Sequence, residues 1–344
     1  MDDAISITTI APTTDSPVME QVRALLERVD ISIDGDVEIL ALAWDDGELI
    51  GCMGLAGPVV KSAAIAPDHQ GRNLMGILLT EIRYLALERG HSKLFLYTKP
   101  QYEQQFATAG FHLLATVPGL VVLMEDDPHG LSDYLSELAK SKVSGERIAG
   151  IVVNANPFTL GHQYLLQTAA QECDHVHVFV VGEDVSQFKY EDRYELVKAG
   201  VAALPEAERI TVHPGSRYIV SRASFPQYFL KEDADISRAF TGIDLQLFRN
   251  HIAPVLGIRH RYVGTEPASE ITNRYNEEML HWLTVPSDYP PIEVHIVDRV
   301  GREGIDFISA SKVRACIQAG DLETLERMLP ATTYEFVKKT YFSR

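Results

Sequence analysis

The chain has 344 residues, of which 46% are hydrophobic, so it is long enough for two domains that each bury a core. Its 48 acidic residues outnumber its 31 basic ones, and the resulting charge of −17 disfavours nucleic acid or an anionic membrane surface as the main partner. The amino end lacks a basic, apolar leader and no stretch is apolar for long enough to span a bilayer, so we expect a cytoplasmic protein.

Residues 1–126 predict a first domain that contains antiparallel sheet. Two runs with strand-like patterns, 37–44 and 48–55, flank Asp45-Asp46-Gly47. An Asp-Gly pair between two such runs is a strong hairpin signal, because both central residues of the favoured turn need a positive φ. We therefore expect an antiparallel hairpin here.

A strand, a loop and a helix follow between Ser62 and about Arg89. Backbone N–H groups at such a helix start can hold a pyrophosphate. This layout resembles the acetyl-CoA-binding motif of the GNAT acetyltransferases, and the stretches 93–98 and 106–112 are similar to the last elements of that family. The resemblance implies a GNAT-like α+β domain in which a coenzyme-A-like arm is held by Gln70, Gly71, Arg72 and Gly76. Asn73 and Met75 replace small residues of the family pattern, so a helix end that only packs is the alternative.

An acidic, turn-forming stretch at 125–130 predicts the domain boundary, and we expect a linker over 127–146. Leucines at 131, 135 and 138 have helical spacing for a single apolar face. The linker should therefore carry a docking helix.

Residues 147–344 predict a Rossmann-like α/β domain with a doubly wound parallel sheet, since apolar strand-like runs alternate with helical patterns. The runs are 147–153, 175–181, 209–213, 261–264 and 292–298. In such sheets ligands bind beyond the carboxyl ends of the strands. The loops after the first, fourth and fifth runs are therefore the places to look for a site.

The loop after the first of these runs reads Asn-Pro-Phe-Thr-Leu-Gly-His, residues 156–162, and opens a helix. A strand–loop–helix junction of this kind favours a bound phosphate. The motif resembles the signature of the nucleotidyltransferase superfamily, which transfers a nucleoside monophosphate from a nucleoside triphosphate. The resemblance implies catalytic roles for Thr159 and His162. It implies ATP-binding roles for Asn154, Asn156, Pro157, Phe158 and Gly161.

A second motif, Ile-Ser-Ala-Ser-Lys-Val-Arg at 308–314, enters a helix after the last run. Alone, it is explained by Ser309 as a helix cap and Arg314 as a surface residue. Paired with the first motif, it resembles the superfamily's second signature, which implies that Ser309 and Ser311 bind the triphosphate and that Arg314 acts in catalysis. An arginine fork suits a leaving pyrophosphate. Mg²⁺ is implied because the nucleotide brings it.

The remaining candidates are placed by position only. Gly264 ends the fourth run and Glu266 follows it, and both are assigned to ATP. The acceptor side is assigned to basic residues between the two motifs, namely Lys189, Arg193, Arg217, Arg222 and Lys231.

Taken over nearly its full length, the sequence closely resembles the citrate lyase ligase family, with a GNAT-like domain followed by the two signatures and by Val263-Gly-Thr-Glu-Pro. The resemblance implies that ATP activates acetate as acetyl-adenylate, with loss of diphosphate. The acetyl group then passes to the thiol of the phosphoribosyl-dephospho-coenzyme-A arm on the citrate lyase acyl carrier protein, AMP is released, and citrate lyase is switched on.

Two alternatives remain open. One is a cofactor-synthesis adenylyltransferase that joins AMP to a phosphate-bearing acceptor and does not depend on acetate. The other is a non-catalytic sensor of nucleotide or acetyl-CoA.

Overall fold

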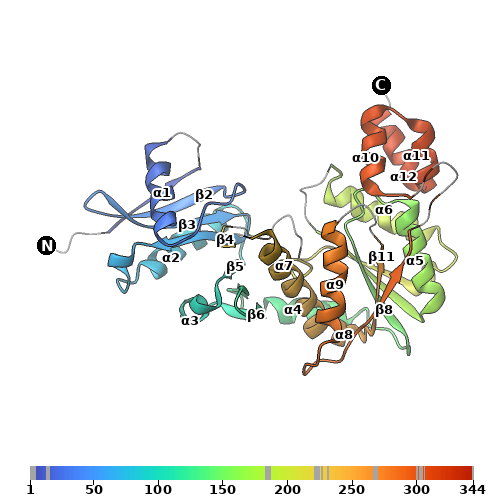
Figure 1. Cartoon of the computed structure of the whole chain (residues 1–344), viewed down its shortest axis with the longest axis horizontal. Coiled ribbons are helices and arrows are strands. Elements are labelled where there is room, and N and C mark those ends of the chain that lie inside the picture. The colour runs from blue at the N-terminus through green and yellow to red at the C-terminus, as the bar shows by residue number, and fades with distance from the viewer. Residues whose placement is uncertain are drawn as a thin grey trace. The chain divides into compact units, whose positions relative to one another are not determined.

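The computed structural model describes residues 5–12, 16–182, 187–220, 225, 228–230, 232–265, 270–299, 301, 305 and 307–342, with only the backbone for 270–276. The chain divides into two compact units (Figure 1), the first made of 1–132 and 226–239 and the second of 133–225 and 240–344. Within the described residues no helix is long and apolar enough to cross a membrane.

The first unit is a mixed seven-stranded sheet in the order β1-β2-β3-β4-β5-β7-β6, with neighbours antiparallel except β4 and β5, which are parallel. Its strands are β1 (Ser6–Ile10), β2 (Ile39–Asp45), β3 (Glu48–Ala56), β4 (Val59–Ile65), β5 (Phe95–Thr98), β6 (His112–Val117) and β7 (Val121–Glu125). Its helices are α1 (Pro17–Arg28), α2 (Leu74–Glu88) and α3 (Glu103–Thr108), with short 3₁₀ turns η1 (Pro67–His69) and η2 (Pro100–Tyr102).

Strand alternation gives this sheet two apolar faces. Leu40 and Leu42 of β2 pack with α1, whereas Ala41 and Ala43 pack with α2. The expected hairpin is confirmed: β2 and β3 are joined through Asp46 (φ +48°) and Gly47 (φ +81°), the two positive φ angles that a tight turn between antiparallel strands favours.

The second unit is built on a five-stranded, all-parallel sheet in the order β10-β9-β8-β11-β12. Its strands are β8 (Ile148–Val153), β9 (His175–Val180), β10 (Ile210–His213), β11 (His260–Gly264) and β12 (Glu293–Val297). Its helices are α5 (Leu160–Glu172), α6 (Tyr190–Ala202), α8 (Ala253–Leu256), α9 (Glu270–Thr284), α10 (Ala310–Ala319), α11 (Leu322–Met328) and α12 (Ala331–Val337). A 3₁₀ turn, η3 (Ala207–Arg209), and two π-helical segments, η4 (Phe248–Ile252) and η5 (Lys338–Phe342), complete this unit. The helices α4 (Gly130–Ala139) and α7 (Asp233–Leu247) each contain a division between the units.

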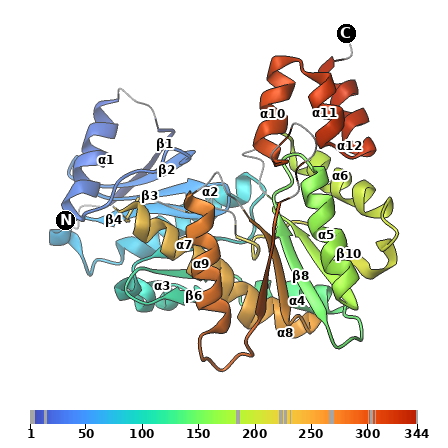
Figure 2. The ribbon, with the colours of Figure 1, turned by 45° about the vertical axis from the view of Figure 1, so that its right-hand side comes forward.

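Helices cover both faces of the parallel sheet (Figure 2). Ala149 and Ile151 of β8 pack in a core with α5 and α6, and Ile148 packs in another with η4 and α9. The predicted fold class, a GNAT-like domain followed by a doubly wound parallel sheet, is therefore confirmed.

One feature of the division was not predicted from the sequence. The stretch 226–239 lies between two strands of the second unit along the chain, yet belongs to the first unit. Tyr228 and Phe229 in this stretch are buried.

A buried pair of histidines makes the second unit sensitive to acid. His177 of β9 is fully buried, and its Nδ1 lies 2.9 Å from Nε2 of His213. Its Nε2 is buried without a hydrogen-bond partner among the described residues. Burial, and then the charges of His213 and His175, lower the pKa of His177 from 6.5 to about 3. The folded state therefore holds this imidazole neutral.

We expect His177→Gln to flatten the acid dependence of stability. A group whose folded pKa is depressed gives stability that is present above its unfolded pKa and is lost as the pH falls toward the folded value. Because of His177, the free energy of unfolding should therefore fall by about 2 kcal/mol between pH 7 and pH 5. The measurement is urea unfolding at both pH values in a Trp44→Phe background, where Trp282 is the remaining tryptophan and reports on the second unit. The exposed His112→Gln serves as control, and an equal pH dependence in both variants would contradict the assignment.

Candidate functional site

The candidate site lies where the order of the parallel strands reverses. β8 has β9 on one side and β11 on the other, and its register with β11 covers only Ala149↔His260 and Gly150↔Arg261. In sheets of this kind, ligands bind beyond the carboxyl ends of the strands at such a reversal. The loop 154–159 follows the carboxyl end of β8, and β11 ends at Gly264, where an added Cβ would meet no described atom within 4 Å.

Thr159 and His162 form a reciprocal cap at the start of α5. The backbone N–H of His162 donates to Thr159 Oγ1 over 3.4 Å, and the backbone N–H of Thr159 donates to His162 Nδ1 over 3.1 Å. Thr159 Oγ1 and His162 Nδ1 are also 2.9 Å apart. Two N–H groups that the helix itself leaves unpaired are satisfied in this way, and the imidazole is fixed against the first turn.

This cap selects one form of the histidine. Since Nδ1 accepts from a backbone N–H, the proton of the neutral ring belongs on Nε2. Burial, and then the charge of Arg299, lower the pKa of His162 from 6.5 to about 4. At neutral pH His162 is therefore an uncharged ring that can donate one hydrogen bond through Nε2.

Arg193 holds the loop 154–159, which precedes the cap, in place. Its guanidinium is fully buried, and Nη1 donates to the carbonyl oxygens of Asn154 (2.7 Å) and Val181 (2.9 Å) and to Asn154 Oδ1 (3.0 Å). These contacts fix the loop in place, and the assignment of Arg193 to the acceptor side stays a prediction. The loop itself bends at Ala155, which has a φ of +49°.

Phe158 anchors the middle of the motif. Its side chain is fully buried against α6, where a Cβ at Gly200 would come within 2.2 Å of the ring. Its ring also stacks on His162, with centroids 5.8 Å apart and planes at 21°. The amide of Asn156 contributes from the same loop, since its Oδ1 accepts from the backbone N–H of Phe188. Pro157, which lies between Asn156 and Phe158 in the sequence, is also buried.

The second motif is in contact with the first. Ser309 caps α10 by accepting from the N–H of Lys312 over 3.2 Å. A Cβ at Gly161 would lie 3.2 Å from the carbonyl oxygen of Ile308, so α5 and the start of α10 approach closely. Arg314 joins the motifs, donating to the carbonyl oxygen of Asn156 over 2.7 Å and to Ser311 Oγ over 3.2 Å. Two helix starts thus converge, and neither first turn contains an acidic residue.

Arg299 belongs to the same group of side chains and was missed by the sequence analysis. It follows β12, and its guanidinium donates to the carbonyl oxygens of Thr265 (2.5 Å) and Ile308 (3.1 Å). Its positive charge helps to lower the pKa of His162. The signal that could have identified it is a basic residue directly after the carboxyl end of the predicted strand 292–298.

Two more of the basic residues assigned to the acceptor side are described by the structure. Lys189 and Arg217 are exposed, and their assignment to an acceptor remains a prediction. The assignments of Glu266, Arg222 and Lys231 lie outside the described residues.

The first unit contains a cavity of about 910 Å³ where β4 and β5 diverge. These strands pair only at Val59↔Phe95 and Val60↔Leu96, and their remaining residues separate. Three of the predicted arm-binding residues line the cavity, namely Gln70, Gly71 and Gly76. Arg72 does not line it, because its guanidinium forms an ion pair with Asp45.

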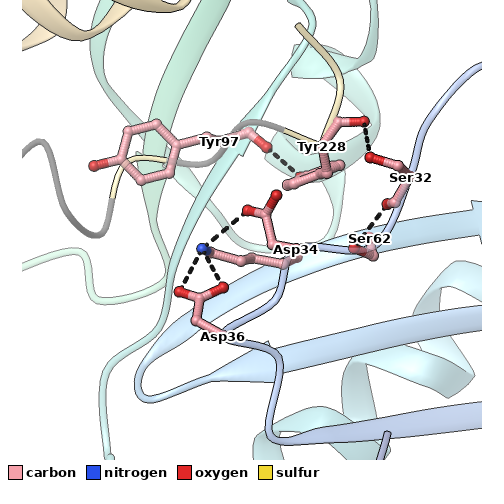
Figure 3. A network of polar contacts seen from close by, with 7 residues as sticks. Ser32, Asp34, Asp36, Ser62, Tyr97 and Tyr228 are labelled. Atoms are coloured by element: carbon pink, nitrogen blue, oxygen red, sulfur yellow. Dashed lines mark hydrogen bonds and ion pairs between the residues drawn. The ribbon is translucent and has the colours of Figure 1, made fainter. Parts of the chain in front are cut away.

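One wall of this cavity comes from the stretch 226–239. The hydroxyl of Tyr228 donates to the carbonyl oxygen of Tyr97 at the end of β5 over 2.9 Å, as Figure 3 shows, and burial raises its pKa. The carbonyl oxygen of Tyr228 accepts from the N–H of Ser32 over 2.8 Å. It also accepts from Ser32 Oγ over 3.3 Å, and Ser62 Oγ donates to the Ser32 carbonyl (Figure 3). Nearby, Lys61 pairs with Asp34 and Asp36.

Together these features define a chain with an acyltransferase-like unit and a Rossmann-like unit that carries paired phosphate-type helix starts. Residues 10–111 match the acetyltransferase (GNAT) family, and residues 148–337 match the citrate lyase ligase C-terminal domain. The chain belongs to the citrate lyase ligase family, which confirms the resemblance described above.

Its curated relatives cover almost the whole chain. The citrate (pro-3S)-lyase ligase of Escherichia coli K12 is 43% identical over 94% of this chain and 92% of its own length. The protein of the same name from Klebsiella pneumoniae is 42% identical over 94% of this chain and 93% of its own length. The protein of the same name from Haemophilus influenzae Rd is 39% identical over 95% of this chain and 97% of its own length.

Proposed function

We propose that this chain is an acid–thiol ligase that acetylates the thiol of the citrate lyase prosthetic group and thereby activates citrate lyase. The observation that carries the proposal is the convergence of Thr159, His162 and Arg314 at two helix starts, in a chain that belongs to the citrate lyase ligase family. The reaction uses ATP and acetate and releases AMP and diphosphate.

The second unit forms the acetyl-adenylate. Displacement at the α-phosphorus needs alignment of the attacking and leaving oxygens and neutralisation of their charge, rather than a covalent bond to the protein. We assign the Nε2–H of His162 to an oxygen of the transferred α-phosphoryl group. Arg314 and Ser311 are assigned to the β- and γ-phosphates, which become the leaving diphosphate. Ser309, Gly161 and Gly264 shape the pocket around ATP.

Mg²⁺ fits this site as a companion of the nucleotide. The first turns of α5 and α10 offer hydroxyl groups and no carboxylates, so phosphate oxygens and water would supply most of its ligands. The ion would neutralise charge on the triphosphate. The residues named above then hold the transferred phosphoryl group and the leaving diphosphate.

The decisive experiment is ATP–pyrophosphate exchange with the purified chain and Mg²⁺, with acetate, phosphopantetheine or nicotinate mononucleotide as the acceptor. The proposal requires exchange that depends on acetate. Exchange only with a phosphate acceptor would indicate a cofactor-synthesis adenylyltransferase, and absence of exchange with every acceptor would favour the sensor.

We further propose that the cavity of the first unit holds the coenzyme-A-like arm of the citrate lyase acyl carrier protein. The start of α2 at Gln70–Gly76 offers N–H groups to the phosphates of the arm, and the cavity extends along β4 and β5 beyond the point where their pairing ends. The cavity volume of about 910 Å³ suits a ligand of this size.

Gly76→Glu should weaken acetyl transfer to the carrier protein while leaving acetyl-adenylate formation intact. A carboxylate in the first turn of α2 is favourable for the helix but repels a phosphate-bearing arm. The new side chain must displace only the end of the Asn73 side chain, 2.7 Å from the added Cβ. We expect KM for the carrier protein to rise about tenfold or more, which corresponds to a loss of about 1.4 kcal/mol.

The matched control is Leu87→Glu, which adds the same charge to an exposed position at the far end of α2. Transfer and pyrophosphate exchange are both measured for each variant. Equal transfer by the two variants would remove the arm from this cavity, without affecting the assignment of the adenylation site.

A further inference from the structure

A cluster of two histidines and a glutamate lies at the amino ends of β11 and β12, away from the adenylation loops. His260 is the first residue of β11, and Glu293 and His295 are the first and third residues of β12. The loops that carry Thr159 and Arg299 instead follow the carboxyl ends of their strands. A five-residue strand rises about 3.3 Å per residue, so its first and last residues are roughly 13 Å apart.

The parallel register brings the three side chains to one face of the sheet. His260 pairs with Glu293, and Tyr262 pairs with His295. Residues opposite each other in a ladder share a face, as do residues two apart in a strand. The cluster is therefore set by the backbone and does not depend on loop placement.

The three side chains lie close enough together to share one metal ion, since one donor atom from each lies within 4.8 Å of the other two. His260 Nδ1 lies 3.0 Å from His295 Nε2 and 3.4 Å from Glu293 Oε2, and His295 Nε2 lies 3.6 Å from Glu293 Oε1. Ligands about 2.0–2.2 Å from a tetrahedral zinc ion are about 3.3–3.6 Å from one another. The two nitrogens need to open by only a few tenths of an ångström.

The surroundings hold the ligands and leave one side open. The ring of Tyr262 stacks on His295 at 4.4 Å and 12°, and its hydroxyl donates to Glu172 over 2.7 Å. His260 is buried, while the side chain of Glu293 is 65% exposed. An ion held here would have solvent access for a fourth ligand.

We propose that His260, Glu293 and His295 bind one divalent transition metal ion of the zinc class, with water as the fourth ligand. Two imidazoles and one carboxylate are a donor set that zinc favours, whereas Mg²⁺ prefers oxygen ligands alone. The ion fastens β12, the edge strand of the sheet, to its neighbour β11. It is separate from the Mg²⁺ that accompanies ATP.

The test uses untagged, full-length protein, because a histidine tag would bind the same ions. After treatment with EDTA and gel filtration, the chain is titrated with Co²⁺, whose four-coordinate complexes absorb in the visible range, and Zn²⁺ is then added as competitor. We expect one equivalent of Co²⁺ with a four-coordinate spectrum, displaced by one equivalent of Zn²⁺ and retained in excess Mg²⁺.

Two variants locate the ion. Glu293→Gln is an exposed, nearly isosteric change that should weaken Co²⁺ binding about tenfold or more, and His295→Gln should abolish the four-coordinate spectrum. His112→Gln, an exposed histidine of the first unit, should bind as the unchanged chain does. The proposal is overturned if the unchanged chain takes up no stoichiometric Co²⁺, or if the His295→Gln variant gives the same spectrum.

Discussion

Replacing Arg314 by alanine should lower acetate-dependent ATP–pyrophosphate exchange by about 10²–10³-fold, the effect of removing a preorganised donor from developing charge. The guanidinium is anchored by the carbonyl oxygen of Asn156 and by Ser311 Oγ, so it is aimed before substrate arrives. Its fork can contact two oxygens of the leaving diphosphate. Exchange measured at saturating ATP and acetate reports this step directly.

Two further variants separate charge from structure. Arg314→Lys retains the charge but cannot form the fork, and we expect an intermediate rate. Arg327→Ala removes an arginine from the neighbouring helix α11 and should leave exchange unchanged. If Arg314→Ala stays within threefold of the unchanged chain while its thermal unfolding is normal, the assignment of Arg314 to the diphosphate fails.

The local parts of the site could be predicted because they depend on neighbours in sequence. Thr159 and His162 are three residues apart, so a cap between them follows from the helix start alone. The strands of the parallel sheet were found for the same reason, since each is a short apolar run bounded by polar turns. Predicted and observed strand ends differ by about one residue.

Contacts between distant segments could not be predicted. The spacing of Arg193 in its helix does not reveal that it points inward to the carbonyl oxygens of Asn154 and Val181. Tyr228 joins the first unit through Tyr97, 131 residues earlier in the chain, and nothing local to Tyr228 indicates that partner. The pairing of His260 with Glu293 likewise requires the order of the strands in the sheet.

The local and distant contacts meet at Arg314. The motif at 308–314 is explained by itself as an ordinary helix start. The hydrogen bond to Asn156, 158 residues away, makes it part of the same site as the first motif. Arg314 therefore connects the motifs at 156–162 and 308–314, which are separate in the sequence.

His162→Asn should lower the exchange rate about 10²–10³-fold at every pH between 6 and 8. Because burial and Arg299 depress the pKa of His162 to about 4, only about one molecule in a thousand is protonated there at pH 7. A neutral ring that donates through Nε2 does not change over this range, so the ratio of the two rates should be constant. If His162 acted as a cationic acid, the unchanged chain would lose activity as the pH rises through the pKa of the histidine. The rate of the unchanged chain divided by that of the variant would then fall, with an inflection at that pKa. The measurement is the pH profile of exchange for both proteins, and a tenfold change in the ratio near pH 6.5 would show that His162 titrates during catalysis.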